Sequence, residues 1–420
     1  MIQRLKPKSE FSKNVLTLMT GTTIAQAIPI AISPILTRIY TPEDFGVLAL
    51  FVAITSIFGS IANGRYELAI MLPKKDENAI NIFALGLIIT FSMSFILLVL
   101  VVLFNEQITE LLKNDEISVW LYFVPIAVLF IGLYNMLAYY NNRKKYYKEL
   151  ANATIIKSIF ASIIQVSIGV FKGGVMGLIS GQILSTIIAN MRLSKNIIND
   201  KLLISNVTKI KIIALAKRYK NFPKFTMWAT LANTLSYQLI SILISAIYNI
   251  STLGSYSLVQ KILGAPSSLI GASIGRVFFQ TAIKEKQHTG KSINVFDDTT
   301  KKLFVIGLPF FGLFYLIVEE FFKFMFGKEW QIAGTYAKIL IPFYFITFIF
   351  SQVSTIFSVF EKQKTALKLQ IGLFTVSITT ICCAKFFNFI FVDFLKVFVV
   401  AMFGYYVYFF YVCRRVATGQ

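Results

Sequence analysis

RLSKNIINDKLLISNVTKIKIIALAKRYKNFPK, residues 192–224, separates two strongly apolar halves of the chain. This stretch holds nine Lys or Arg residues and a single acid, Asp200. Both flanks consist of apolar runs long enough to cross a lipid bilayer. Because short cytoplasmic loops of membrane proteins are enriched in Lys and Arg, the stretch predicts a basic cytoplasmic connector. The predicted domains are residues 1–191, the connector 192–224, and residues 225–420.

The centre of the connector mixes apolar and basic side chains. The apolar residues are Ile210, Ile212, Ile213 and Leu215, and the basic ones are Lys211, Lys217 and Arg218. This pattern is typical of a short amphipathic helix that lies in the inner membrane interface. A solvated loop is the alternative interpretation.

The overall composition indicates an integral membrane protein. Hydrophobic residues make up 56% of the chain and charged residues only 15%, which differs strongly from the average soluble domain. A net charge of +21 would suggest nucleic-acid binding in a soluble chain. Here the basic residues lie in short loops between apolar spans, so positive-inside bias explains them and we expect no nucleic-acid partner.

Largely charge-free runs, the eighth of which carries Lys261 and Arg276, predict six membrane spans on each side of the connector and an all-α fold of about twelve transmembrane helices. The spans lie near residues 14–37, 46–64, 79–104, 118–140, 151–171, 173–191, 225–248, 252–279, 303–324, 339–360, 366–384 and 396–413. With both termini in the cytoplasm, the inner segments contain 29 Lys or Arg residues and the outer loops 8. We therefore predict two six-helix bundles with cytoplasmic termini.

A short internal repeat relates the two halves. Tyr40, Gly46 and Leu50 return as Tyr248, Gly254 and Leu258 at a constant offset of 208 residues. Both triplets fall at the outer turn between the first and second span of a half, where glycine permits a tight turn. An even number of spans per half makes the repeats parallel, and transporters often bind substrate between such halves.

Proline interrupts several of the predicted spans. The residues are Pro29, Pro34, Pro125, Pro266, Pro309 and Pro342. Proline removes a backbone hydrogen bond and kinks a helix, so these positions predict hinges and cavity-lining backbone. The alternative is that they have no special role, since membrane helices tolerate proline more than soluble ones.

Four short segments carry a resemblance to a known family. Residues 35–46, ILTRIYTPEDFG, resemble the O-antigen and capsule polysaccharide flippases of the multidrug/oligosaccharidyl-lipid/polysaccharide exporter superfamily. The segments RYELAI at 65–70, YKNFP at 219–223 and FGKEW at 326–330 are similar to recurring segments of that family. The likeness covers residues 14 to about 365, and from Leu369 onward only the hydrophobicity matches.

The resemblance implies a MATE-like fold, with two six-helix bundles around a central cavity. It also implies a flippase of the bacterial inner membrane that moves undecaprenyl-diphosphate-linked oligosaccharides from the cytoplasmic to the periplasmic leaflet. The product would be O-antigen of lipopolysaccharide, or capsule. The implied partners are this lipid-linked oligosaccharide, membrane lipid and polysaccharide polymerase machinery; no cofactor is implied, and H+ or Na+ remain open as the coupling ion.

Two other classes of protein are alternatives to a flippase. A cation-coupled multidrug exporter of the same fold would need acids in its cavity to attract organic cations. A membrane polysaccharide polymerase or ligase would expose a large outer loop with acid and base residues, and none of the predicted loops is large. His288 is the only histidine, so we expect neither a catalytic nor a metal site.

Ionisable residues within spans are candidates for substrate binding, because each costs about 2.5 to 3.5 kcal/mol at a helix centre. Lys261 lies about nine residues from the outer start of its span, roughly 14 Å into a hydrocarbon core about 30 Å thick. We expect it to face the cavity and bind the diphosphate, with Gln260 as a polar neighbour at the same depth. The alternative is a structural partner for a buried carbonyl or acid.

Three further charged residues are predicted near the inner face. Arg65 and Arg276 would draw the headgroup in before it reaches Lys261, since arginine suits bidentate phosphate capture. For Arg276, snorkelling to the interface is the alternative. Glu67 is expected on the helix face opposite Arg65, as its i+2 neighbour, and so to be a poor partner for it. It would instead pair with a base from another span, or carry a coupling proton.

Overall fold

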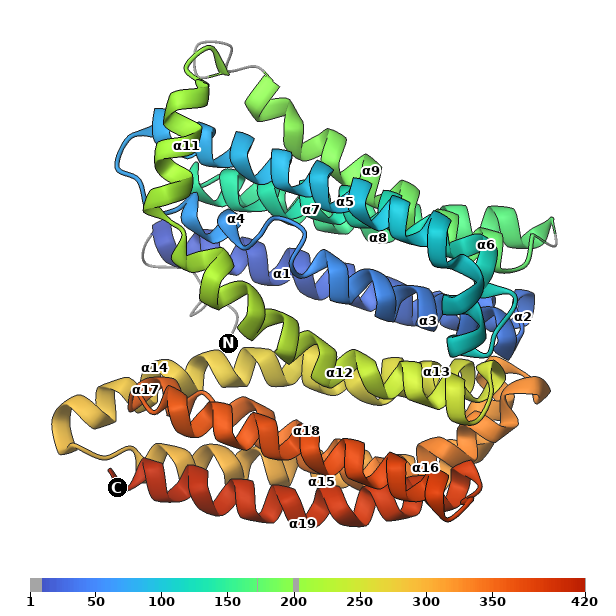
Figure 1. The fold of residues 1–420 in the computed structure, drawn as a ribbon. Helices are drawn as coiled ribbons and strands as arrows, with labels where there is room; N and C mark the ends of the chain where they lie inside the picture. The colour runs from blue at the N-terminus through green and yellow to red at the C-terminus, as the bar shows by residue number, and fades with distance from the viewer. Residues whose placement is uncertain (1–9, 172, 199–203, 420) are drawn as a thin grey trace. The chain divides into compact units, whose positions relative to one another are not determined.

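The computed structural model describes residues 10–171, 173–198 and 204–419. Over these ranges the chain forms helices joined by short turns, and no β-strand occurs among the described residues (Figure 1). The prediction of an all-α fold is confirmed.

Ten helical segments of the described chain are long and apolar enough to cross a membrane. They are Thr17–Ile39, Pro42–Gly59, Asp76–Leu112, Ile117–Arg143, Tyr147–Val170, Phe222–Ile247, Ile293–Phe326, Lys328–Val359, Gln363–Phe386 and Phe391–Ala417. Since only helices with satisfied backbone groups and closed barrels cross a bilayer, this chain is a multi-pass helical membrane protein.

The two remaining predicted spans are helical but more polar. Residues 173–191 fall in α9 (Val175–Ile198). Residues 252–279 fall in α13 (Ile250–Pro266), the π-helical segment η3 (Ser267–Gly271) and α14 (Ala272–Thr289). Serine, threonine and amide side chains lower the hydropathy of these helices, so the count of twelve stays a prediction.

The helices form two compact units. The first comprises the described part of Met1–Ile32 and of Val47–Ala246, and the second comprises Ser33–Gly46 and the described part of Ile247–Gln420. The units group residues by spatial contact, whereas the predicted domains follow the order of spans along the chain. The predicted boundaries at residues 192 and 225 therefore stay predictions.

The first unit is a bundle of long helices, most of which run side by side in Figure 1. Its helices are α1 (Glu10–Ala31), most of α3 (Pro42–Gly59), α4 (Tyr66–Ala69), α5 (Asp76–Leu112), α6 (Ile117–Leu121), α7 (Val124–Arg143), α8 (Tyr147–Val170), α9, α11 (Lys209–Arg218), η2 (Phe222–Thr226) and nearly all of α12 (Met227–Ile247). Helix α8 packs against α1 and α9, and α7 packs against α5 and α9. Ile70, Phe83, Tyr140 and Leu193 are buried in its core.

The connector contributes one helix, α11, to this unit. Thr208 caps it by accepting a hydrogen bond from the Lys211 amide, and its own amide donates to the side chain of Asn81 on α5. Leu215 is buried in the core of the unit, whereas Ile210 is 82% exposed. The predicted helix is confirmed, and its position in the membrane interface stays a prediction.

The second unit is organised around α16 (Gln331–Val353), which packs against α13, α14, α15 and α19. Its other helices are α2 (Ser33–Ile39), the first turn of α3, α15 (Ile293–Phe326), η4 (Lys328–Trp330), α17 (Ile356–Val359), α18 (Gln363–Phe386) and α19 (Phe391–Ala417). Helix α18 packs against α19. The stretch from Leu369, which resembles the family only in its hydrophobicity, therefore belongs to this unit.

Two of the segments that carry the family resemblance contact each other in the second unit. The indole of Trp330 is fully buried and donates a 2.9 Å hydrogen bond to the carbonyl of Thr37. Its ring meets the edge of Phe45, and Arg38 donates to the carbonyl of Phe324. Residues 35–46 and 326–330 thus form one packed cluster.

The repeated glycines form a close helix crossing. A Cβ atom built on Gly46 would lie 2.0 Å from the carbonyl oxygen of Ile250, and one on Gly254 would lie 1.8 Å from that of Pro42. Each glycine therefore faces the residue four positions before the other, which is the reciprocal pattern of a pseudo-twofold contact. The repeat places the first turns of α3 and α13 in backbone contact.

Some of the six proline residues interrupt their helices, and others do not. Helix α1 ends just after Pro29, and α2 begins beside Pro34; Pro125 lies in the first turn of α7, and Pro266 ends α13 at the π-helical segment. The prediction of interrupted helices is confirmed at these sites. Pro309 and Pro342 instead lie inside the uninterrupted helices α15 and α16.

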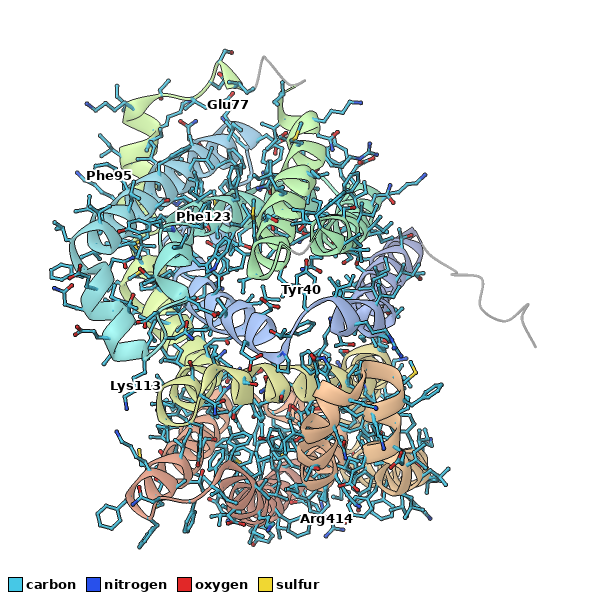
Figure 2. All side chains as sticks on the ribbon, turned by 90° about the vertical axis from the view of Figure 1, so that its right-hand side faces the viewer. Tyr40, Glu77, Phe95, Lys113, Phe123 and Arg414 are labelled. Carbon is cyan, nitrogen blue, oxygen red and sulfur yellow. The ribbon has the colours of Figure 1, made fainter. Side chains whose placement is uncertain are left out.

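Charge is distributed unevenly between the two ends of the first unit. Figure 2 labels Glu77 and Lys113 at the two ends of α5, with Phe95 exposed between them. At the Glu77 end, Asp76 pairs with Arg143 and Lys144, and Glu77 pairs with Lys211 of α11. The connector and this end of α5 therefore lie on the same side of the membrane.

We expect that side to be cytoplasmic, because it carries most of the basic residues. In a variant lacking Cys382, Cys383 and Cys413, a cysteine placed at Lys8 or Ser205 should resist an impermeant thiol reagent in intact cells. It should react in inverted vesicles. Lys8 lies outside the described residues, and Ser205 is exposed. Labelling of either position from outside would contradict the predicted orientation.

Candidate functional site

The strongest predicted site residue, Lys261, lies well inside α13. It follows the first residue of that helix by eleven positions, which corresponds to about 16 Å. Its side chain is partly exposed and has neither an ion-pair nor a hydrogen-bond partner within the described part of the chain. An unpaired base at this depth is costly, so its position is better suited to an anionic ligand than to stability.

Polar and aromatic groups lie on the turns of α13 next to Lys261 and on the facing helix of the second unit. Gln260 is hydrogen-bonded to the buried hydroxyl of Tyr256, one turn earlier on α13. Tyr344 of α16 lies against Gly264, less than one turn beyond Lys261. The two tyrosines were not among the predicted site residues, because nothing in the sequence distinguishes them from core aromatics. Together these groups offer one cation and several hydrogen-bond donors.

Arg65 and Glu67 form an ion pair, so the prediction that they are poor partners is wrong. The Arg65 Nη1 atom lies 2.9 Å from Glu67 Oε1. The prediction assumed one regular helix, but Gly64 and Arg65 both have left-handed backbone, with φ of +58° and +64°. This turn reverses the chain before α4 begins, and the i+2 spacing of a helix does not apply.

The pair lies in the turn between α3 and α5, outside the ten candidate spans. The Glu67 side chain is 2% exposed, and its Oε2 atom has no hydrogen-bond partner within the described residues. Burial raises the pKa of the Glu67 carboxyl, and the Arg65 guanidinium opposes this shift. Tyr66 links the turn to α11 by donating a hydrogen bond to the carbonyl of Ala216.

Removing the Glu67 charge should destabilise the first unit. Glu67→Gln leaves the Arg65 guanidinium without a charged partner, which should cost about 3 to 5 kcal/mol for a largely buried pair. Glu77→Gln is the matched control, because its ion pair with Lys211 is exposed and such pairs contribute about 1 kcal/mol or less. Thermal unfolding in detergent measures both, and equal shifts would contradict the structural role of the Arg65–Glu67 pair.

The remaining predicted residue, Arg276, lies on α14, and its side chain is outside the described part of the structure. Elsewhere, His288 lies in the last turn of α14, and Asp297 pairs with Arg414. The described residues contain no group of three His, Cys, Asp or Glu side chains that could hold a metal ion.

Comparison with known proteins identifies the family. The family described as polysaccharide biosynthesis protein matches residues 35–334, which is more than two thirds of the chain. The chain belongs to this family. The matched range includes the packed cluster around Trp330, the Arg65–Glu67 turn and Lys261.

One curated relative is the succinoglycan biosynthesis transport protein ExoT of Rhizobium meliloti (strain 1021). It is 23% identical over 313 residues, which cover 71% of this chain and 59% of the relative. The chain thus spans about three fifths of the length of that relative.

Two solved structures show the fold. The lipid II flippase MurJ in an inward closed conformation has a TM-score of 0.72 at 15% identity, covering 94% of this chain and 87% of MurJ. An inward-facing multidrug resistance MATE family transporter has a TM-score of 0.65 at 13% identity, covering 93% and 94%. The predicted MATE-like fold is confirmed, and at these identities the likeness concerns the fold alone.

Proposed function

We propose that this member of the polysaccharide biosynthesis protein family is a flippase, not an enzyme. Its substrate is an undecaprenyl-diphosphate-linked oligosaccharide repeat unit, which it moves from the cytoplasmic to the periplasmic leaflet of the bacterial inner membrane. The repeat units supply surface polysaccharide of the O-antigen or capsule type, through polysaccharide polymerase machinery. The family match and the transport role named for the relative support this proposal.

The observation that carries the proposal is the unpaired Lys261 beside Gln260 and Tyr256. A diphosphate is a compact dianion, and a lysine ammonium in a partly desolvated site attracts it more strongly than in water. The amide and phenol groups add hydrogen bonds to its oxygens. Arg276 and the Arg65 turn then act as earlier contacts for the headgroup near the inner face.

The second candidate is a cation-coupled multidrug exporter, which the MATE likeness of the fold also permits. An organic cation needs an accessible acid, yet Glu67 is buried and already paired with Arg65. The charge of the site around Lys261 has the wrong sign for such a substrate. This difference favours the flippase.

Deleting the gene from its host tests the proposal. Surface polysaccharide should disappear, and lipid-linked repeat units should accumulate on the cytoplasmic leaflet. Resistance to cationic dyes should not change. Normal polysaccharide combined with a loss of dye efflux that depends on H+ or Na+ would support the exporter instead.

The membrane potential should contribute to transport. Moving a diphosphate outward, down an inside-negative potential, releases about 2.3 kcal/mol per charge per 100 mV, or about 4.6 kcal/mol for two charges. This holds if no counter-charge moves with the substrate. In proteoliposomes, abolishing the potential at a constant pH gradient should slow flipping, and an unchanged rate would show that the net transported charge is zero.

A further inference from the structure

The second unit contains an apolar groove between α13 and α15. Both helices pack against α16, and Phe348 of α16 lies in the floor of the groove with Leu263 and Phe311. The cavity has a volume of about 510 Å³, within the range of ligand sites in proteins. All its lining residues are aliphatic, aromatic, glycine or proline, so only a hydrocarbon ligand avoids unpaired polar groups.

The groove is long and runs along the membrane-spanning direction of α15. Its lining extends from Ile306 to Phe321, which corresponds to about 22 Å of helix. On the other side, Pro266 ends the regular part of α13, and the π-helical segment η3 follows. A long apolar groove fits a flexible chain better than a compact ring system.

A positively charged residue, Lys261, lies next to the residues that line this groove. Lys261 lies one residue before Ile262 and one helical turn before Ala265, and both of those residues line the groove. Its ammonium group is unpaired within the described residues. The same stretch of α13 therefore offers a charge for a phosphate and an apolar surface for a chain.

We propose that the groove holds the isoprenoid chain of the lipid carrier while its diphosphate contacts Lys261. This inference rests on the proposed flippase function and names a second subsite for the same substrate. A bulk phospholipid fits less well, because its headgroup stays at the interface, whereas Lys261 lies about 16 Å from the first residue of α13. Only a lipid whose headgroup is in transit brings a phosphate to that depth.

Photolabelling in proteoliposomes tests the groove directly. The probe is a polyprenyl diphosphate with a diazirine on its chain, and a phosphatidylethanolamine with a diazirine on an acyl chain serves as the comparison. Trypsin releases the two walls as peptides 262–276 and 303–323. The polyprenyl probe should label these peptides above all others, and unlabelled polyprenyl diphosphate should compete.

A matched pair of tryptophan variants adds a second test. Ile306→Trp fills the groove and should lower polyprenyl labelling of both peptides about tenfold. Leu313→Trp lies on the same helix outside the groove and should leave labelling unchanged. Both positions are at least half exposed, at 50% and 66%, so neither change overpacks the core.

The outcomes separate this inference from the proposed function. Equal labelling by the phospholipid probe without competition would mean that the groove holds surrounding lipid only, and would overturn the inference. So would unchanged labelling of Ile306→Trp. If the wild-type protein still flips lipid-linked oligosaccharide in these cases, the proposed function survives. A wild-type protein that flips none would overturn both.

Discussion

Replacing Lys261 with alanine is expected to abolish surface polysaccharide while the protein stays inserted and folded. The ammonium has no partner in the described structure, so its loss leaves no protein group unpaired. A hydrogen bond between charged groups contributes about 1.5 to 3 kcal/mol, which corresponds to roughly a 10- to 150-fold loss in affinity for the diphosphate. Surface polysaccharide and membrane-inserted protein are measured on the same cells.

Two conservative variants serve as controls for the Lys261 prediction. Lys261→Arg should keep part of the activity because the charge is retained, although the planar guanidinium differs in shape from an ammonium. Arg276→Lys should be nearly silent if that residue only snorkels to the interface. Normal transport by Lys261→Ala would refute the cationic site and would favour a multidrug exporter over a flippase.

Substituting Gly254 by alanine is expected to destabilise the second unit severely. The new Cβ atom would lie 1.8 Å from the Pro42 carbonyl oxygen, which is backbone and cannot rotate away. Overpacking of a core usually costs about 1 to 3 kcal/mol, and displacing two helix backbones should cost at least the upper value. Gly46→Ala meets the carbonyl of Ile250 and should have a similar effect.

Gly312 supplies the matched control for these glycine variants. It also lies within a helix, but a Cβ atom built on it meets nothing within 4 Å. Gly312→Ala should therefore be neutral or slightly stabilising, because alanine favours helix more than glycine. Thermal unfolding in detergent compares the three variants, and a Gly254→Ala protein as stable as wild type would show that the α3–α13 crossing can open without cost.

The glycine crossing illustrates what the sequence could predict. The offset of 208 residues indicated that Gly46 and Gly254 occupy equivalent outer turns. It did not indicate that the two turns touch, because contact between distant segments leaves no periodic signal in one sequence. The apolar runs likewise predicted the helices, since twenty or so consecutive apolar residues have few other stable states.

The Arg65–Glu67 pair shows where sequence reasoning failed. In a helix, residues i and i+2 point to opposite faces, but this rule holds only when the backbone is helical. The Gly64–Arg65 turn takes left-handed backbone at both residues, and at Arg65 only the surrounding structure can enforce it. A glycine directly before a charged residue at the end of a span was the available signal for this turn.

The groove beside Lys261 could not be predicted at all. Its walls come from α13 and α15 and its floor from α16, so it exists only after these helices pack. By contrast, Lys261 and Gln260 stood out in the sequence because polar groups within a span are rare. Chemistry that is unusual for its surroundings is visible in a sequence, whereas shape is not.

Flipping by the purified protein in proteoliposomes tests the proposed function most directly. A fluorescent polyprenyl-diphosphate oligosaccharide is placed in both leaflets, and a membrane-impermeant reductant quenches only the molecules that reach the outside. With wild-type protein we expect quenching to continue beyond the outer leaflet until little fluorescence remains, and with Lys261→Ala we expect it to stop at the outer-leaflet fraction. Wild-type vesicles that stop at the same level as protein-free vesicles would contradict the proposed flippase.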